Sequence, residues 1–476
     1  MTSRQRIVAL TVACALFMQT LDSSVLGTAL PAIGRDFGLD PVHLHLAMTS
    51  YLIALAVFMP MSGWIADNFG TRNVLRIAIV IFVAASVGCG YSSSIGELAV
   101  MRIIQGMGGA MMVPVARLAL LRAVPKASLV QAMTWVSVPA LLGPVVGPPL
   151  GGFLVTYASW PWIFWINVPI GVIGIVLASV FFENLKNPET PKFDRIGFAL
   201  SSCAVGGILF GLELAPRSGL TALSGFGLIA LGLIMAGFYG LHARRHPAPI
   251  LDLTLMRVQT FRVSILAGSL FRIGIGAIPF LLPLMLQQSF GRSAIASGMI
   301  TFSAAAGAIA MKLATTRALS TFGFRNTLVW NAGLAGVSIA VIALFKDSTP
   351  AWVMIALLFI GGFFRSLQFT ALNAIGFSDL DDKQMSRATG FSAMVQQLSL
   401  SIGVTVAALT LQFLPYLRGE TGASESDYSI AFVIVGVLVS LSALAFMRLD
   451  ADAGENVSGH AATVGGENRP PSSPRT

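Results

Sequence analysis

Two short segments of the chain are nearly the same: residues 70–75 read GTRNVL and residues 323–328 read GFRNTL. A second pair follows each of them, RIIQ at 102–105 and RSLQ at 365–368. Either match alone could be chance, but both pairs occur in the same order and at equivalent places among the surrounding apolar stretches. The sequence therefore predicts an internal duplication.

The duplication divides the chain into four parts. It predicts a six-helix half over residues 1–185, two linker helices over 186–256, a second six-helix half over 257–448, and a tail over 449–476. Many secondary transporters are built from such repeats, with the substrate site near the bilayer midplane between them. The tail is rich in Gly, Ser, Pro and Asn and has no apolar face, so we expect it to be disordered and cytoplasmic.

The composition is that of an integral membrane protein. Of the 476 residues, 55% are apolar and only 11% are charged, and the mean hydropathy is +0.79. A soluble protein carries about 25% charged residues, so a soluble protein is excluded, and with it a nucleic-acid partner. The three cysteines all lie inside apolar stretches, which excludes a disulfide scaffold.

Fourteen apolar stretches are long enough to cross a bilayer, which takes about 20 residues per helix. Their approximate bounds are 7–30, 46–66, 74–92, 98–120, 131–155, 162–182, 196–214, 222–241, 262–287, 294–315, 326–345, 351–376, 388–413 and 428–447. We therefore expect an all-α integral membrane protein with 14 transmembrane helices.

The basic residues predict which side of the membrane each loop faces. With the N-terminus in the cytoplasm, 20 of the 30 Lys and Arg residues fall in cytoplasmic segments and 5 fall outside. This asymmetry follows the positive-inside rule and predicts that both termini are cytoplasmic. The formal net charge of +9 thus reflects cytoplasmic loops rather than a basic partner.

Five motifs resemble those of the major facilitator superfamily, in particular its fourteen-span drug:proton antiporters. They are LDSSVLGTALP at 21–31, GWIADNFGTR at 63–72, RIIQGMGG at 102–109, GPVVGPPLGG at 143–152 and WIFWINVPIG at 162–171. The chain departs from the family pattern at Asn68, where a basic residue is usual, and at Pro139, where Gly is usual.

The resemblance implies the major facilitator fold in a bacterial inner membrane. It also implies a monomer that exports small molecules in exchange for protons, with multidrug export as the usual function of the group. Two further interpretations of the sequence remain open. One is export of an organic anion or of an anionic metal chelate such as a polycarboxylate complex. The other is a membrane sensor that transports nothing.

Asp22 is the only carboxylate that we place well inside a span. An ionised group at the bilayer centre costs roughly 3 kcal/mol or more, so such residues tend to face cavities and to be functional. Asp22 is therefore our candidate for proton coupling, and the resemblance implies that Arg102 assists. The alternative is a residue near the external end of the first helix that is bonded only to Ser23 or Ser24.

Two sets of motif residues predict moving parts. The resemblance implies a cytoplasmic gate and an antiporter motif that closes the external side, although a tight turn and ordinary helix packing are the competing interpretations. The gate residues are Gly63, Asp67, Gly70, Arg72, Gly323 and Arg325, and the antiporter motif comprises Gly143, Pro144, Gly147, Pro148, Gly151 and Gly152.

Polar residues inside the spans are candidates for the substrate cavity, because each needs a partner in or beside the bilayer. They are Gln19, Gln105, Arg272, Arg365 and Gln396. Asp22 can neutralise at most one or two of the arginines, so the cavity should attract anions. The sequence contains no metal-ligand spacing inside a span and no phosphate-binding Gly-Lys-Ser/Thr loop, so we expect neither an enzyme nor a cofactor.

Overall fold

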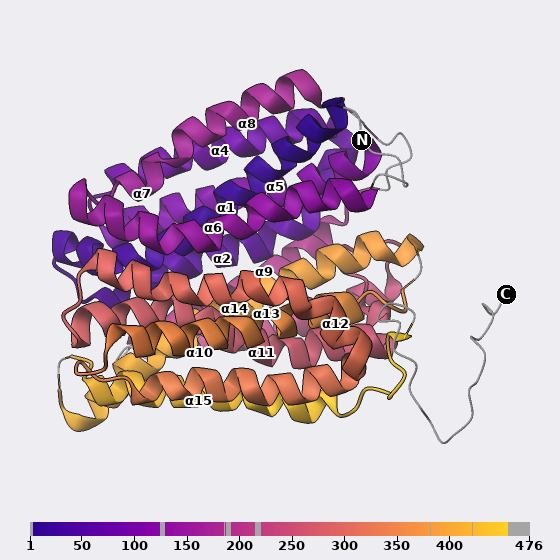
Figure 1. Cartoon of the computed structure of the whole chain (residues 1–476). Helices are drawn as coiled ribbons and strands as arrows, with labels where there is room; N and C mark the ends of the chain where they lie inside the picture. Colours follow the sequence, from indigo (N-terminus) through magenta and orange to yellow (C-terminus); the bar gives the residue numbers. More distant parts are fainter. Residues whose placement is uncertain are drawn as a thin grey trace.

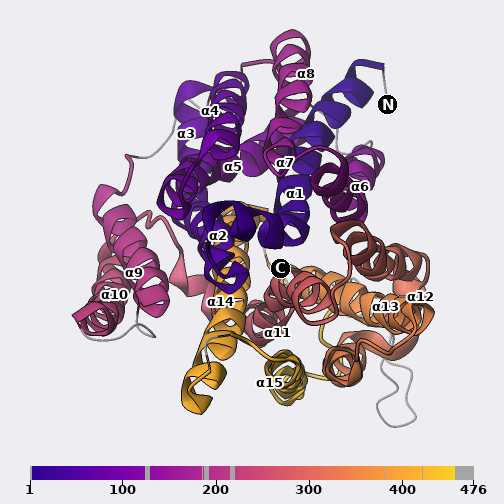
Figure 2. The ribbon, with the colours of Figure 1, turned by 90° about the vertical axis from the view of Figure 1, so that its left-hand side faces the viewer.

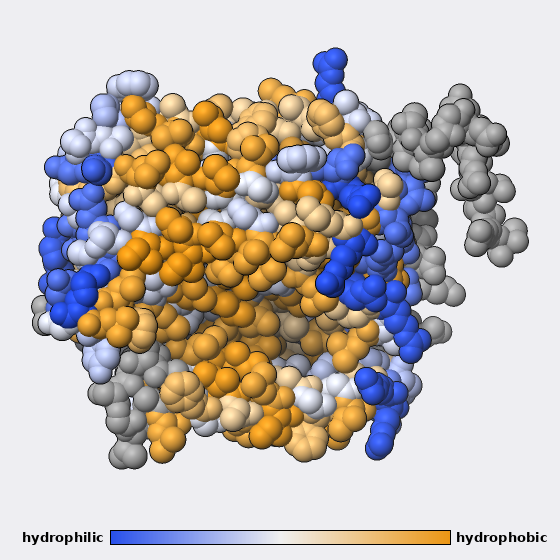
Figure 3. All heavy atoms as spheres, turned by 90° about the horizontal axis from the view of Figure 1, so that it is seen from below, coloured by the Kyte–Doolittle hydropathy of each residue, from blue (hydrophilic) through white to orange (hydrophobic). Residues whose placement is uncertain are grey.

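The computed structural model of the chain describes residues 3–123, 129–184, 186, 192–214, 220–380, 382–420 and 422–455. These residues form helices that run roughly alongside one another in one large bundle (Figure 1). Apolar side chains make a broad belt on the surface between two polar ends (Figure 3). Such a belt suits a lipid environment, where helices satisfy all their backbone hydrogen bonds internally.

The first half contains eight helices, two pairs of which continue one another. Their bounds are α1 Ser3–Phe37, α2 His45–Phe58, α3 Ser62–Phe69, α4 Thr71–Tyr91, α5 Ile95–Ala123, α6 Leu129–Tyr157, α7 Trp162–Trp165 and α8 Asn167–Phe181. A short 3₁₀ turn joins α2 to α3, and α7 leads into α8. α1 extends beyond the predicted 7–30 until Gly38, whose positive φ of 65° ends it.

Two linker helices and a second half of five helices follow. The linkers are α9 Arg195–Leu214 and α10 Leu220–Arg245; the second half comprises α11 Gln259–Leu284, α12 Ala294–Ala340, α13 Ala351–Ile375, α14 Asp382–Arg418 and α15 Glu425–Phe446. α12 contains two of the predicted spans in one run, separated by a kink at Gly323, where φ is 70° and ψ is 170°.

The predicted fold class is confirmed. Thirteen segments of the described residues are long and apolar enough to cross a membrane, and the remaining predicted span corresponds to α6, whose described apolar portion is Val145–Tyr157. The predicted disordered tail lies mostly outside the described residues, which end at 455. The linker helices α9 and α10 stand at the side of the bundle, where α9 packs against α2 and α14 (Figure 2).

The two halves meet most closely at the end of the bundle opposite the N-terminus. Figure 1 shows that they converge toward α7 and diverge toward the end where α1 begins. At the converging end, Gln287 Nε2 donates to Thr28 O at 3.1 Å. Gly152 of α6 lies directly against the backbone of Ala294, at the start of α12. The bundle is therefore closed at the end away from the termini.

Candidate transport site

An ion pair between α1 and α5 lies inside the first half. Nη1 of Arg102 donates to Oδ2 of Asp22 at 2.5 Å, and each side chain is about 1% exposed. Nε of Arg102 donates to the backbone oxygen of Ala47 on α2 at 2.9 Å. The guanidinium also lies 4.2 Å from the ring centroid of Tyr51, a cation–π contact. Arg102 therefore joins α1, α2 and α5.

Ser86, Gln105 and Asn167 surround this ion pair. We call the five residues Asp22, Ser86, Arg102, Gln105 and Asn167 the central network. Gln105 Nε2 donates to Asp22 Oδ1 at 2.8 Å and to Ser86 Oγ at 2.6 Å. Asn167 Nδ2 donates to the same two oxygens at 3.1 and 3.0 Å. The carboxylate is thus held by one cation and two amides, an arrangement that offsets the cost of burying its charge.

The sequence names Asp22, Arg102 and Gln105 only as separate candidates, and the structure brings the three side chains together. The participation of Ser86 and Asn167 was missed. Asn167 lies inside the motif at 162–171, and its place near the start of the sixth predicted span, 162–182, was the available signal. Ser86 carried no signal, because a serine in an apolar helix usually bonds to its own backbone.

The second half repeats part of this network without a carboxylate. Gln368 Oε1 accepts from Asn331 Nδ2 at 2.9 Å, and Gln368 Nε2 donates to Leu328 O at 3.1 Å. Arg365 occupies the place that corresponds to Arg102 in the repeated motif and is 8% exposed. Its Nη1 is buried and has no hydrogen-bond partner among the described residues.

Arg272 on α11 is a second buried cation without an acid. It is fully buried, and its Nη1 donates to Ser264 O at 3.2 Å, whereas its Nε and Nη2 have no partner among the described residues. No ion pair joins Arg272 or Arg365 to a carboxylate in the described part of the chain. Two buried positive charges are therefore left uncompensated.

The two remaining candidates for the substrate cavity are Gln19 and Gln396. Gln19, which lies on α1 one turn before Asp22, is 7% exposed, and its Oε1 has no partner among the described residues. Gln396 on α14 is half-buried. The structure does not bring Gln396 into the central network.

The predicted gate of the first half is built on a turn. Gly70 has φ 90° and separates α3 from α4, and a side chain there would collide with Asn184, just after α8. Asn184 Oδ1 accepts from the backbone N–H of Asn73 at 3.3 Å. Arg72 is half-buried, and its Nε has no hydrogen-bond partner among the residues that the structure describes. The turn is thus held against the last helix of its own half.

The second-half turn follows the same plan. Gly323 adopts φ 70°, and Arg325 Nη2 donates to Met447 O at 3.3 Å, just after α15. Both turns therefore pack on the last helix of their half, which agrees with the duplication. Gly63 and Asp67 lie on α3 with partial or full exposure, and a Cβ on Gly63 would meet nothing within 4 Å.

The glycines of the antiporter motif form a stripe on α6 that packs on α1. A side chain at Gly143, Gly147 or Gly151 would collide with Thr20, Ser24 or Thr28 of α1 respectively, and Ser24 Oγ donates to Gly143 O at 3.1 Å. Asp22 lies in the same stretch of α1. The side chain of Pro144 lies outside the described residues, and Pro148 O lies against Gly298 of α12.

Comparison with known proteins agrees with this architecture. The sequence profile of the Major Facilitator Superfamily matches residues 12–404, and the chain belongs to that family. It is a multi-pass membrane transporter and not an enzyme. The resemblance inferred from the five motifs is thereby confirmed.

Sequence relatives and solved structures extend the comparison. Proteins named MdtD, provisionally described as multidrug resistance proteins, are 35% identical over 451 residues in Escherichia coli and over 449 in Citrobacter koseri. Each alignment covers 94% of this chain and 95% of the relative.

Among solved structures, a D-xylose-proton symporter has a TM-score of 0.67 at 13% sequence identity. The match covers 93% of this chain and 97% of the symporter chain. The nucleoside transporter NupG gives 0.58 at 13% identity, covering 94% and 98%.

Proposed function

We propose that this protein exports small molecules across a bacterial inner membrane in exchange for protons, by alternating access of its two halves. The observation that carries the proposal is the central network, in which a buried carboxylate is held by a single cation and two amides. When Asp22 takes up a proton it loses the charge that pairs with Arg102, so proton binding must weaken the contact between α1 and α5.

The position of Asp22 supports the coupling of this event to a change of shape. The carboxylate lies on the stretch of α1 that packs on the α6 glycine stripe, and α6 in turn contacts α12 of the other half through Gly152. A shift of α1 relative to α5 would therefore reach the contact between the halves. This arrangement suits the rocking of one repeat against the other by which such transporters alternate access.

We further propose that the two turns at Gly70 and Gly323 form the cytoplasmic gate, with both termini on the cytoplasmic side. The open space around Gly63 supports this assignment, because a gate that has separated leaves its small residues without neighbours.

A specific observation favours an anionic substrate as a second candidate. Arg272 and Arg365 place two positive charges without a paired carboxylate in the second half, and Nε and Nη2 of Arg272 and Nη1 of Arg365 have no hydrogen-bond partner among the described residues. A buried charge without a partner is costly unless a ligand or water neutralises it. An organic anion, either alone or as a metal chelate, would supply that charge, whereas a lipophilic cation would be repelled.

Reconstitution of the purified chain into liposomes tests the main proposal. With an imposed proton gradient, we expect substrate movement and a matching proton flux detected by an internal pH-sensitive dye. Asp22→Asn should abolish the proton flux, and Asp22→Glu should retain part of it, because only Glu can still ionise. Unchanged proton coupling in Asp22→Asn would remove Asp22 from the mechanism.

A thermal-shift panel separates the substrate classes. Lipophilic cations and citrate-like anions, with and without metal, are each added to the protein in detergent. A ligand at 100 times its Kd should add about 2.7 kcal/mol to the folded state. Stabilisation by anions that is lost in Arg272→Met would support the anionic substrate, and stabilisation by cations alone would support multidrug export.

A further inference from the structure

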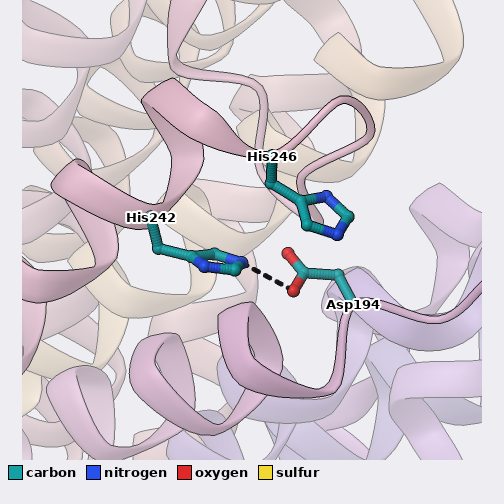
Figure 4. A group of neighbouring side chains, drawn as sticks. All are labelled: Asp194, His242 and His246. Atoms are coloured by element: carbon teal, nitrogen blue, oxygen red, sulfur yellow. Dashed lines mark hydrogen bonds and ion pairs between the residues drawn. The ribbon is translucent and has the colours of Figure 1, made fainter.

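Three potential metal ligands lie close together at the polar surface, where the linker helix α9 begins and the linker helix α10 ends. Asp194 directly precedes α9, while His242 lies in the last turn of α10 and His246 one turn further along the chain. Their ligand atoms all lie within 4.8 Å of one another. Figure 4 shows the carboxylate of Asp194 between the two imidazole rings, whose centroids are 5.1 Å apart.

Asp194 is already fixed as a metal ligand would need to be. Its Oδ1 accepts from Gly197 N at 2.8 Å and from His242 Nε2 at 2.7 Å, and its Oδ2 accepts from Ile250 N at 3.3 Å. Backbone bonds of this kind orient the ligands in known metal sites.

The arrangement exceeds what a helix cap requires. Capping α9 uses only the contact from Gly197 to Asp194. It does not explain why two histidines spaced four residues apart, the second of which donates its backbone N–H to His242 O at 3.0 Å, lie beside that carboxylate. His246 takes no part in the cap, because its Nδ1 instead accepts from Ala248 N at 3.2 Å.

The distances are compatible with a metal after a small movement. Zinc binds His nitrogen and carboxylate oxygen at about 2.0–2.2 Å, so tetrahedral ligands lie roughly 3.3 Å apart. The distance between His242 Nε2 and Asp194 Oδ1, now 2.7 Å, must increase slightly, and the ring of His246 must turn toward these two atoms. That turn breaks only the long bond to Ala248, which is at the upper limit for an N–H donor.

His246 also lines an open pocket of roughly 660 Å³, which offers access to the site. Three arginines, Arg244, Arg257 and Arg387, share this pocket with His246, and Asp252 pairs with Arg387 at 3.1 Å. Mg²⁺ and Ca²⁺ need many oxygen ligands, whereas only Asp194 among the three residues supplies oxygen. Imidazole nitrogen suits zinc and similar ions, and the pocket side leaves room for a water or a small anion as fourth ligand.

We propose that Asp194, His242 and His246 bind a divalent transition-metal ion of the zinc class. The bound ion would tie the start of α9 to the end of α10 and to the segment that leads into α11. The site lies on the linker pair, away from the central network, so it is independent of the transport mechanism proposed above.

Zinc binding by the full-length, untagged protein in detergent tests the proposal. After treatment with a chelator, the protein is titrated with Zn²⁺ by calorimetry, and Co²⁺ replaces Zn²⁺ for absorption spectroscopy. We expect one tight equivalent of zinc and the visible bands of tetrahedral cobalt. His246→Ala should weaken zinc binding at least about tenfold while it leaves the His242–Asp194 pair in place.

Two more variants keep the test decisive. His242→Gln preserves a donor to Asp194 but is a poor zinc ligand, so it should weaken binding as His246→Ala does while the protein stays folded. The exposed His43 lies on the 3₁₀ turn Pro41–Leu44, and His43→Ala should bind like the unaltered protein. Absence of a tight equivalent, or equal zinc affinity in His246→Ala and His43→Ala, would overturn the proposal.

Discussion

Asp22 and Arg102, which lie 80 residues apart in the sequence, form an ion pair from which solvent is almost completely excluded. Gln105 and Asn167 hold the same carboxylate, so Asp22 is supported by three side chains from α5 and α8. The repeated position in the second half, Arg365, lacks any such acid. The two halves have thus kept a common architecture with different charge, and this asymmetry leads to the following predictions.

Removing one member of the pair should cost more than removing both. Asp22→Asn leaves Arg102 buried without a counter-charge, and breaking such a pair typically costs about 3–5 kcal/mol. The double variant Asp22→Asn/Arg102→Met should recover part of that loss, because no buried charge remains. Thermal unfolding in detergent compares the variants. Equal stability of the single and double variants would contradict the view that charge governs this contact.

Arg272→Met should stabilise the ligand-free protein. Replacing an unpaired buried charge by an apolar side chain of similar size removes a desolvation penalty, and related replacements are neutral or stabilising by about 1–4 kcal/mol. The midpoint of thermal unfolding should therefore rise, while any stabilisation by anions disappears. A fall in the midpoint without ligand would show that Arg272 is a structural residue rather than a ligand-binding one.

The glycine stripe of α6 should tolerate no added methyl group. Gly147→Ala places a carbon against the Ser24 side chain, so α1 and α6 must separate, and overpacking of this kind costs about 1–3 kcal/mol. Gly206 on α9 is the matched control, since a Cβ there meets nothing within 4 Å. Gly206→Ala should remain as stable as the parent or gain slightly. Transport and unfolding assays on both variants provide the measurement.

Substitutions at the two turn glycines should be destabilising for a backbone reason. Gly70 and Gly323 adopt φ values of 90° and 70°, which an L side chain rarely adopts. Gly70→Ala should be more harmful than Gly63→Ala for a second reason, because its Cβ also collides with Asn184, whereas a Cβ on Gly63 meets nothing within 4 Å. Expression and thermal stability of the two variants, compared with Gly63→Ala, test this order.

The linker pair should lose stability in acid through Asp194. The pKa of this carboxyl in the folded protein is below its ordinary value, so its contribution is fully present above the unfolded-state pKa of about 3.9. The contribution is lost as the pH falls through the lower folded-state pKa. Asp194→Asn should therefore unfold with a flatter pH dependence below pH 4, as monitored by exchange of the amides in α9. An unchanged profile would contradict the role of the ionised carboxylate.

The sequence by itself determined the fold class and the family. Apolar stretches of bilayer length require helices, since lipid offers no partner for an unpaired backbone group. The repeated GTRNVL and GFRNTL segments pointed to the two halves because each half needs the same left-handed glycine at the same turn. The candidates Asp22, Arg102 and Gln105 could also be named, because polar residues inside a span are rare and need partners.

Only the tertiary structure decided which polar residues meet. Nothing in the sequence indicates that Asn167 and Ser86 reach Asp22 or that Gln396 stays out of the network. The histidines at 242 and 246 gave no signal as ligands, because their third partner, Asp194, precedes a different helix. Helical periodicity fixes which residues share a face, whereas contacts between helices depend on how those faces pack. For this reason the spans could be read from the sequence, and the pairing of their charges required the folded chain.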